Sequence, residues 1–262
     1  MQEGREGRRL KITAALALAV LLLTCVPMEL GSGLPPAGPG SGDPQEPLAC
    51  RPTLTVAQSK RIQVLSKELR AARRDVRELP DGYSFQLPAS PSMLIDLAEY
   101  LTLLGTCCPY FDVMVKSERE GGPVWLTLSG REGVKALAKT ELGIRHVATN
   151  LMVSGTASKA KESPLACDDK ALTATQLKRV VELVKGFRAS KQEVAELADG
   201  YAIRLPRGSS TIHEVAEYMG IIRICSPYFE TTLQAGCEGG QIWLRVTGRK
   251  GVKGLAKEEF GI

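Results

Sequence analysis

Histidine is almost absent from this chain of 262 residues, which contains only His146 and His213. Neither histidine has a counterpart at the matching position of the chain's internal repeat. A Ser-His-Asp or Cys-His hydrolase built into both repeats is therefore excluded, and so is a zinc site of the ordinary Cys/His type, for which no matching spacing exists. No motif in the sequence names a reaction or a ligand.

A strong charge of one sign is also lacking. The net charge is +5, and part of it comes from four basic residues near the start of the chain, namely Arg5, Arg8, Arg9 and Lys11. This balance gives little ground for a nucleic-acid partner, and none is expected. With 44% hydrophobic and 24% charged residues, the composition is that of a foldable globular protein.

Residues 12–28 contain no charged side chain and follow the basic start of the chain. A basic flank before an apolar run predicts an export signal or membrane anchor over residues 1–30, with the rest of the chain translocated to a periplasmic or other extracytoplasmic location. The letters LLTC at residues 22–25 resemble a bacterial lipobox but depart from it at Leu23 and Thr24. We expect an anchored product, through a lipid on Cys25 or an uncleaved helix; cleavage and release is the alternative.

Residues 31–50 are rich in glycine and proline and nearly devoid of large apolar side chains. Such a segment cannot bury enough apolar surface to fold, so it predicts a tether. After a membrane signal, a tether suits a domain that is held away from a membrane surface. A cleaved exported protein could begin in the same way.

An internal repeat organises the rest of the chain. Residues 54–144 align without a gap with residues 172–262, so that ELPDGYSFQLP matches ELADGYAIRLP and LAEYLTLLGTCCPYF matches VAEYMGIIRICSPYF. Self-similarity of this extent predicts two copies of one structural unit. We expect module 1 over residues 51–144, a polar linker over 145–171 and module 2 over 172–262.

Hydrophobic spacing and turn signals predict the order α-β-α-β-β-α within each module. For module 1 the predicted elements are a helix over residues 55–79, a strand over 83–87, a helix ending at Cys108 before Pro109, a hairpin of strands over 111–116 and 123–128, and a helix over 131–141. A βαβ unit with one antiparallel edge strand would make a small mixed three-stranded sheet. The expected fold class is α+β, in two tandem modules that could pair pseudo-symmetrically.

Two adjacent cysteines, Cys107 and Cys108, end the second predicted helix, whereas module 2 has Cys225 and Ser226 there. Adjacent Cα atoms are about 3.8 Å apart, which strains a mutual disulfide. The pair could instead offer two sulfur donors to a soft metal ion, or act as a reactive thiol with its resolving partner. The plainer alternatives are that these cysteines are small buried residues or that they form a structural disulfide.

Helical spacing places other groups beside these thiols. Glu99 and Tyr100 fall on the same side of the helix as Cys107, and Glu217 and Tyr218 stand in the same relation to Cys225. They are candidates to support a bound ion, although a glutamate on a solvated helix face is the simpler interpretation of Glu99 and Glu217.

Two further cysteines, Cys50 and Cys167, each follow Leu-Ala just before a module. In an oxidising compartment they could form a disulfide with each other, or each could bond to its own module.

The segments LPDGYSFQLP, LAEY, CCPYF and GGPVWLTLSGREGVKALAKTELG resemble, almost end to end over one module, an uncharacterised group of small bacterial proteins with a Cys-Cys-Pro-Phe core. Members of that group usually hold one module, and here the resemblance covers both. It implies a shared fold and a thiol but no activity. The chain departs from the pattern at Ser226 and at Gly105-Thr106, where an arginine is common.

Together these features favour an exported, membrane-tethered, non-enzymatic binding protein. Its expected ligand is a soft metal ion or metalloid, held best by Cys107 and Cys108 and less well by Cys225. One alternative is a thiol oxidoreductase with Cys107 as nucleophile. The other is a purely structural or interaction module with buried cysteines. The expected partner is a membrane, reached through the N-terminus.

Overall fold

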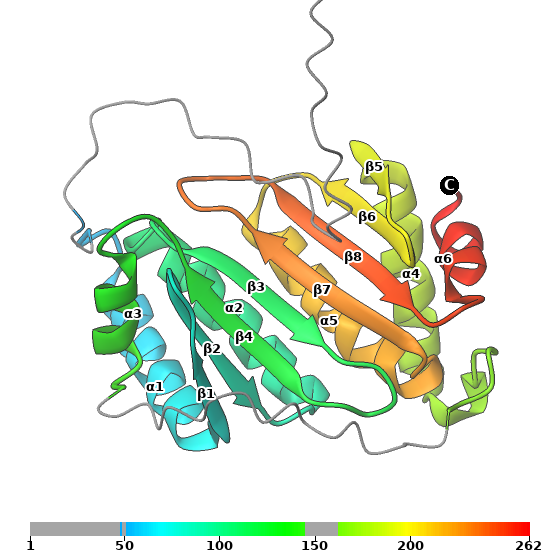
Figure 1. Ribbon diagram of the computed structural model, residues 1–262, viewed down its shortest axis with the longest axis horizontal. Helices are drawn as coiled ribbons and strands as arrows, with labels where there is room; N and C mark the ends of the chain where they lie inside the picture. The colour runs from blue at the N-terminus through cyan, green and yellow to red at the C-terminus, as the bar shows by residue number, and fades with distance from the viewer. Residues whose placement is uncertain (1–47, 49–50, 145–161) are drawn as a thin grey trace, which may run out of the picture. The chain divides into compact units, whose positions relative to one another are not determined.

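The structure is a computed structural model that describes residue 48 and residues 51–144 and 162–262 (Figure 1). The expected signal with Cys25, the position of Cys50 and most of the linker lie outside these residues. Within the part of the chain that is described, no helix combines the length and apolar character needed to cross a membrane.

Each repeat forms three α-helices and four strands. The N-terminal repeat contains α1 (Val56–Ala72), β1 (Asp75–Glu78), β2 (Gly82–Leu87), α2 (Pro91–Cys107), β3 (Asp112–Ser117), β4 (Val124–Ser129) and α3 (Val134–Glu141). The C-terminal repeat begins with a short 3-10 helix, η1 (Asp169–Ala171), and contains α4 (Ala174–Ser190), β5 (Glu193–Glu196), β6 (Gly200–Leu205), α5 (Ser209–Cys225), β7 (Phe229–Ala235), β8 (Ile242–Gly248) and α6 (Val252–Phe260).

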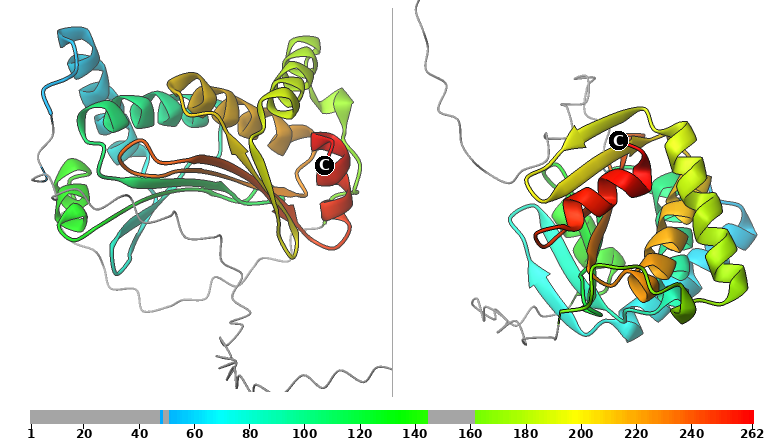
Figure 2. Two further views of the ribbon diagram at one scale, coloured as in Figure 1. Left: turned by 90° about the horizontal axis from the view of Figure 1, so that it is seen from above. Right: turned by 90° about the vertical axis from the view of Figure 1, so that its right-hand side faces the viewer.

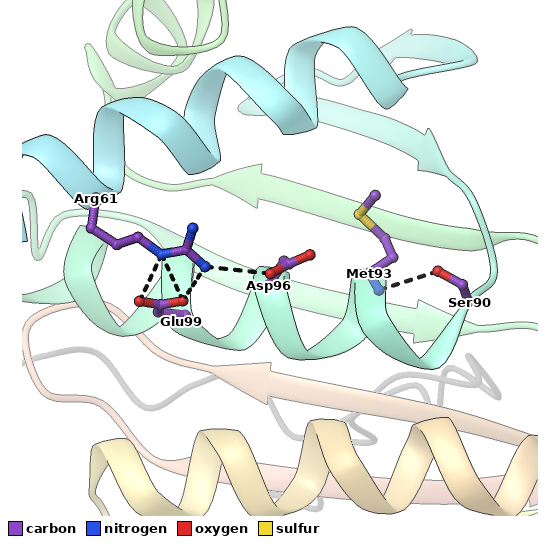
Figure 3. A network of polar contacts seen from close by, with 5 residues as sticks. All are labelled: Arg61, Ser90, Met93, Asp96 and Glu99. Atoms are coloured by element: carbon purple, nitrogen blue, oxygen red, sulfur yellow. Dashed lines mark hydrogen bonds and ion pairs between the residues drawn. The ribbon is translucent and has the colours of Figure 1, made fainter.

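Capping residues in the sequence set where the helices begin. Thr55 starts α1 with a capping box, in which its side chain accepts a hydrogen bond from the Gln58 N–H and the Gln58 side chain accepts one from the Thr55 N–H. Thr173 does the same for α4. The Ser90 hydroxyl accepts a hydrogen bond from the Met93 N–H at the start of α2 (Figure 3).

The predicted first helix over residues 55–79 is wrong at its C-terminal end. Helix α1 stops at Ala72, and Asp75–Glu78 form the edge strand β1, which pairs antiparallel with β2. Val76 follows Leu69 at a spacing that also suits one face of a helix, so the apolar pattern did not separate the two structures. The C-terminal repeat has the same arrangement, with β5 beside β6.

The eight strands form one sheet, in the order β1-β2-β4-β3-β7-β8-β6-β5, and every neighbouring pair is antiparallel. The class is α+β, but the prediction of two modules with separate mixed three-stranded sheets is wrong. Strand β4 lies between β2 and β3 and pairs with both. The βαβ unit therefore exists only in a split form, in which its two parallel strands do not touch.

The two repeats join through β3 and β7. Val115 pairs with Leu233, its own counterpart in the repeat, and the register is symmetric about this pair. Each β-hairpin also reaches the other repeat, because the Glu120 N–H donates to the Pro227 carbonyl and the Glu238 N–H donates to the Pro109 carbonyl, both at 2.6 Å. Backbone hydrogen bonds thus connect the repeats into one folded unit.

Helices α1, α2, α4 and α5 lie on one face of the sheet (Figure 2), and α2 packs against α5. Helix α3 packs on β2 and β4, and α6 packs on β6 and β8. The main core lies between the helices and the sheet, where Tyr100 and Tyr218 are fully buried. The C-terminal ends of α2 and α5, which carry the cysteines, are part of this core.

Candidate functional site

The two cysteines at the end of α2 differ in chemical state. Cys107 is buried with a free thiol, whose Sγ is 3.7 Å from the Leu104 carbonyl, and burial raises its pKa. Cys108 is disulfide-bonded. The four other cysteines in the described regions are free, so the partner of Cys108 is not among them. In this state the adjacent pair offers only one thiol.

The matching end of α5 brings together two free thiols, those of Cys225 and Cys167. Cys225 is buried and Cys167 is exposed. Burial, followed by a hydrogen bond with the Cys167 thiol, raises the pKa of Cys225 to about 12. The Ser226 hydroxyl lies 3.8 Å from the Cys225 sulfur and accepts a hydrogen bond from the Tyr228 hydroxyl at 3.2 Å. Cys167, proposed above as a partner of Cys50, is thus a neighbour of Cys225.

A short stretch of chain, residues 165–168, carries Cys167 to this position; we call it the docking segment. The Asp168 N–H donates to the Cys225 carbonyl at 2.7 Å. Leu165 lies over Gly251, whose φ of +97° and lack of a side chain leave room for it. The signal that could have revealed this docking is the Leu-Ala-Cys triplet before each repeat.

The chain just before the N-terminal repeat makes matching contacts with that repeat. The Arg51 N–H donates to the Cys107 carbonyl at 2.7 Å, as Asp168 does to Cys225. Leu48 lies over Gly133, which matches Gly251. Leu48 and Arg51 thus contact the N-terminal repeat as Leu165 and Asp168 contact the C-terminal repeat.

An open pocket of about 680 Å³ lies over the thiol pair. Its apolar wall comes mainly from α4, where Val181 remains 60% exposed and Leu177 37% exposed. The lining residues with polar or charged groups are Cys167, Cys225, Ser226, Tyr228, Glu258, Glu259, Lys185 and Arg188. The volume and the mostly apolar walls are typical of sites for small molecules.

The α4 wall is specific to the C-terminal repeat. Leu177, Val181 and Val184 of α4 align with the polar residues Ser59, Gln63 and Ser66 of α1. Helix α1 also exposes Val56 and Val64, but at other positions of the repeat, so the apolar wall of this pocket has no match there.

A carboxyl group with an unusual pKa lies in the pocket lining. Partial burial raises the pKa of Glu259 to about 7, although the Tyr218 hydroxyl donates to its Oε1 at 2.9 Å and the positive charge of Arg188 lowers the pKa. In the N-terminal repeat, the buried Tyr100 hydroxyl has no hydrogen-bond partner in the described structure. The repeats thus differ at this position as well as at the thiols.

Glu99 and Glu217, the proposed supports of a bound ion, are held by arginines instead. Arg61 of α1 donates from Nε and Nη2 to Glu99 and also pairs with Asp96 (Figure 3). The hydrogen bond with Arg61 lowers the pKa of Glu99. Arg179 of α4 binds Glu217 in the same way, with Nη2 at 2.7 Å. These pairs join each first helix to the next and leave little capacity for an ion.

The side chains that could act as metal ligands limit which ions could bind. In the described part of the chain there is no group of three or more His, Cys, Asp or Glu side chains arranged to hold a metal ion. The remaining free thiol, Cys237, lies in the hairpin of the C-terminal repeat, where burial first and then the charge of Asp112 raise its pKa to about 11. Within the described residues, Cys167 and Cys225 are therefore the two free thiols that could bind one ion together.

The chain matches no protein-family profile, no curated protein and no solved structure. The resemblance to small Cys-Cys-Pro-Phe proteins therefore stays a prediction, and a function has to be argued from the site itself.

Proposed function

We propose that the protein is an exported, membrane-tethered, non-enzymatic binding protein, and that the thiols of Cys167 and Cys225 bind one soft metal ion or trivalent metalloid. The observation that carries the proposal is that both free thiols line the same open pocket, where the Asp168 N–H, next to Cys167 in the chain, donates to the Cys225 carbonyl at 2.7 Å. The proposal therefore differs from the expectation that Cys107 and Cys108 form the better soft-ion site, because Cys108 is disulfide-bonded.

Two thiolates suit ions that accept two soft ligands, such as Cu(I) and Hg(II). A tetrahedral zinc site would need further ligands that the described residues do not group together. On binding, each thiol loses its proton and forms a bond from sulfur to the ion, so two protons are released. Cys167 is exposed and gives the ion access, whereas Cys225 is buried and fixes its position.

The test is a titration of the purified full chain with Hg(II) or Cu(I), with bound metal counted after desalting. We expect one tightly bound ion per chain, and Cys167→Ser or Cys225→Ser should each abolish this stoichiometric binding. Cys237→Ser and Cys107→Ser are the controls, because each removes a free thiol elsewhere. Full uptake by the Cys167→Ser plus Cys225→Ser double variant would overturn the assignment, as would no uptake by the wild-type chain.

A second candidate is dithiol–disulfide exchange, favoured by the pairing of an exposed thiol with a buried one. A Cys167–Cys225 disulfide would take two electrons from a substrate dithiol, giving two protein thiols and a substrate disulfide. The pKa of about 12 at Cys225 weakens this candidate, since a thiol of high pKa is a poor leaving group when the substrate thiolate attacks the disulfide. For Cys107 as nucleophile, burial raises the pKa and so lowers the fraction of reactive thiolate.

Exchange kinetics separate the two candidates. An oxidoreductase would speed the reduction of a model disulfide by glutathione, and Cys167→Ser would remove the acceleration. The binding proposal expects equal rates with the wild-type chain and the variant. If serine at Cys107, Cys167 and Cys225 changed only the free energy of unfolding and no binding, the third alternative, a purely structural role, would hold.

A further inference from the structure

A second cavity lies where the two repeats meet, at positions where one repeat has glycine and the other has a large side chain. Gly105 near the end of α2 aligns with Arg223 near the end of α5. Arg223 is partly buried, and its Nη2 donates to the Gly122 carbonyl in the hairpin of the N-terminal repeat at 2.9 Å. One repeat therefore inserts a guanidinium group against the hairpin of the other.

On the opposite side of the junction the corresponding space is open. A Cβ added to Gly105 would meet no atom within 4 Å. Gly105 lines a cavity of about 180 Å³, which we call the junction cavity, and Gly236 lines it where the other hairpin has Glu118. Two large side chains of one half are thus replaced by glycine in the other.

The hydrogen-bond acceptor that Arg223 uses has a counterpart in this cavity. Gly240 aligns with Gly122 and lines the junction cavity. None of the described residues donates a hydrogen bond to its carbonyl oxygen. Leu101, Phe111 and Leu233 supply apolar walls, and Glu238 and Arg207 bring one charge of each sign. The Glu238 carboxylate already lies at the edge of ion-pair distance from Arg131, with 4.0 Å between Oε1 and Nε.

We propose that the junction cavity binds a small alkylguanidinium ligand, in the position that the Arg223 side chain occupies in the other half. The guanidinium donates to the Gly240 carbonyl, near the Glu238 carboxylate, and the alkyl part lies against the apolar walls. A planar group with several N–H donors suits this arrangement better than an ammonium ion, because it can donate to the carbonyl and the carboxylate together. This site is separate from the thiol pair and does not depend on the function proposed for it.

The test is calorimetric titration of the full chain with butylguanidinium. We expect one site, and Gly105→Arg should weaken binding by at least about tenfold, because the new side chain fills the cavity. Gly105→Ala is the matched control, since it gives a similar gain in helix propensity but leaves the cavity open. Its affinity should stay within about twofold of the wild-type value.

The reciprocal variant, Arg223→Gly, should open a second cavity and raise the stoichiometry from one ligand to two per chain. This measurement stands even if Gly105→Arg fails to fold. No binding to the wild-type chain, unchanged binding to Gly105→Arg, or no second site in Arg223→Gly would each overturn the proposal. Equal affinity for butylammonium would overturn the guanidinium assignment.

Discussion

Among single residues, Glu259 should give the protein a measurable dependence on pH. Its pKa is about 7 in the folded state against an ordinary value of 4.5, because burial disfavours the charged carboxylate. The folded state thus binds the proton more tightly than the unfolded state. The stabilisation is complete below pH 4.5 and is lost as the pH rises through 7.

Glu259→Gln should remove this dependence, since the amide stays neutral. The free energy of unfolding, followed by urea denaturation from pH 4.5 to 8, should fall by on the order of 2–3 kcal/mol in the wild-type chain and much less in the variant. Glu141→Gln, at the matching position of α3, is the control and should keep the wild-type slope. An unchanged slope in Glu259→Gln would contradict the prediction.

The candidate site was only partly predictable from its residues. The repeat showed that Cys107 and Cys225 occupy equivalent helix ends and that Ser226 replaces Cys108. The contact between Cys167 and Cys225 was missed, because it depends on how the docking segment folds back onto α5, and local spacing carries no information about such a distant contact. Because Cys107 and Cys108 are adjacent in the chain, the sequence predicted that they form the site, but the sulfur of Cys108 is bound in a disulfide.

At the scale of elements, β2 and β4 approach so closely that a side chain on Gly82 would overlap the Leu128 carbonyl. Gly200 stands in the same relation to Val246. Gly82→Ala should therefore force these strands apart and destabilise the fold by about 3 kcal/mol or more. Urea denaturation measures the change.

The control is Gly186→Ala in α4, where an added Cβ meets nothing within 4 Å. This substitution should stabilise the protein by up to about 1 kcal/mol through helix propensity. If Gly82→Ala left the free energy of unfolding unchanged or raised it, the backbones of β2 and β4 could separate at little cost and the prediction would be wrong.

The elements differ in how far their sequences determine them. Threonine caps and Pro109 mark the helix ends, and the predicted hairpin strands lie within a residue of β3 and β4. The strand order was not predictable from the hydrophobic pattern. A central strand alternates apolar and polar residues in the same way whichever two strands lie beside it. The short strands β1 and β5 carry too few apolar residues to be distinguished from the end of a helix.

For the whole molecule, the shared sheet predicts cooperative unfolding. Unpairing one repeat would expose a complete edge of β3 or β7 and the α2–α5 contact, so partial unfolding is unfavourable. Scanning calorimetry should show one transition, with equal calorimetric and van't Hoff enthalpies. Val115→Asp, at the centre of the junction, should shift that single transition to a lower temperature. Two resolved transitions in the wild-type chain would show that the repeats fold independently.

The symmetric register of β3 and β7 also changes what a substitution can do. In a dimer of identical chains, every replacement would appear twice, once on each side of the twofold axis. Joining both halves in one chain allows a replacement on one side only, as at Gly105 and Arg223 or at Cys108 and Ser226. Covalent linkage thus allows a side chain to fill the space on one side of the junction while the matching space on the other side stays open.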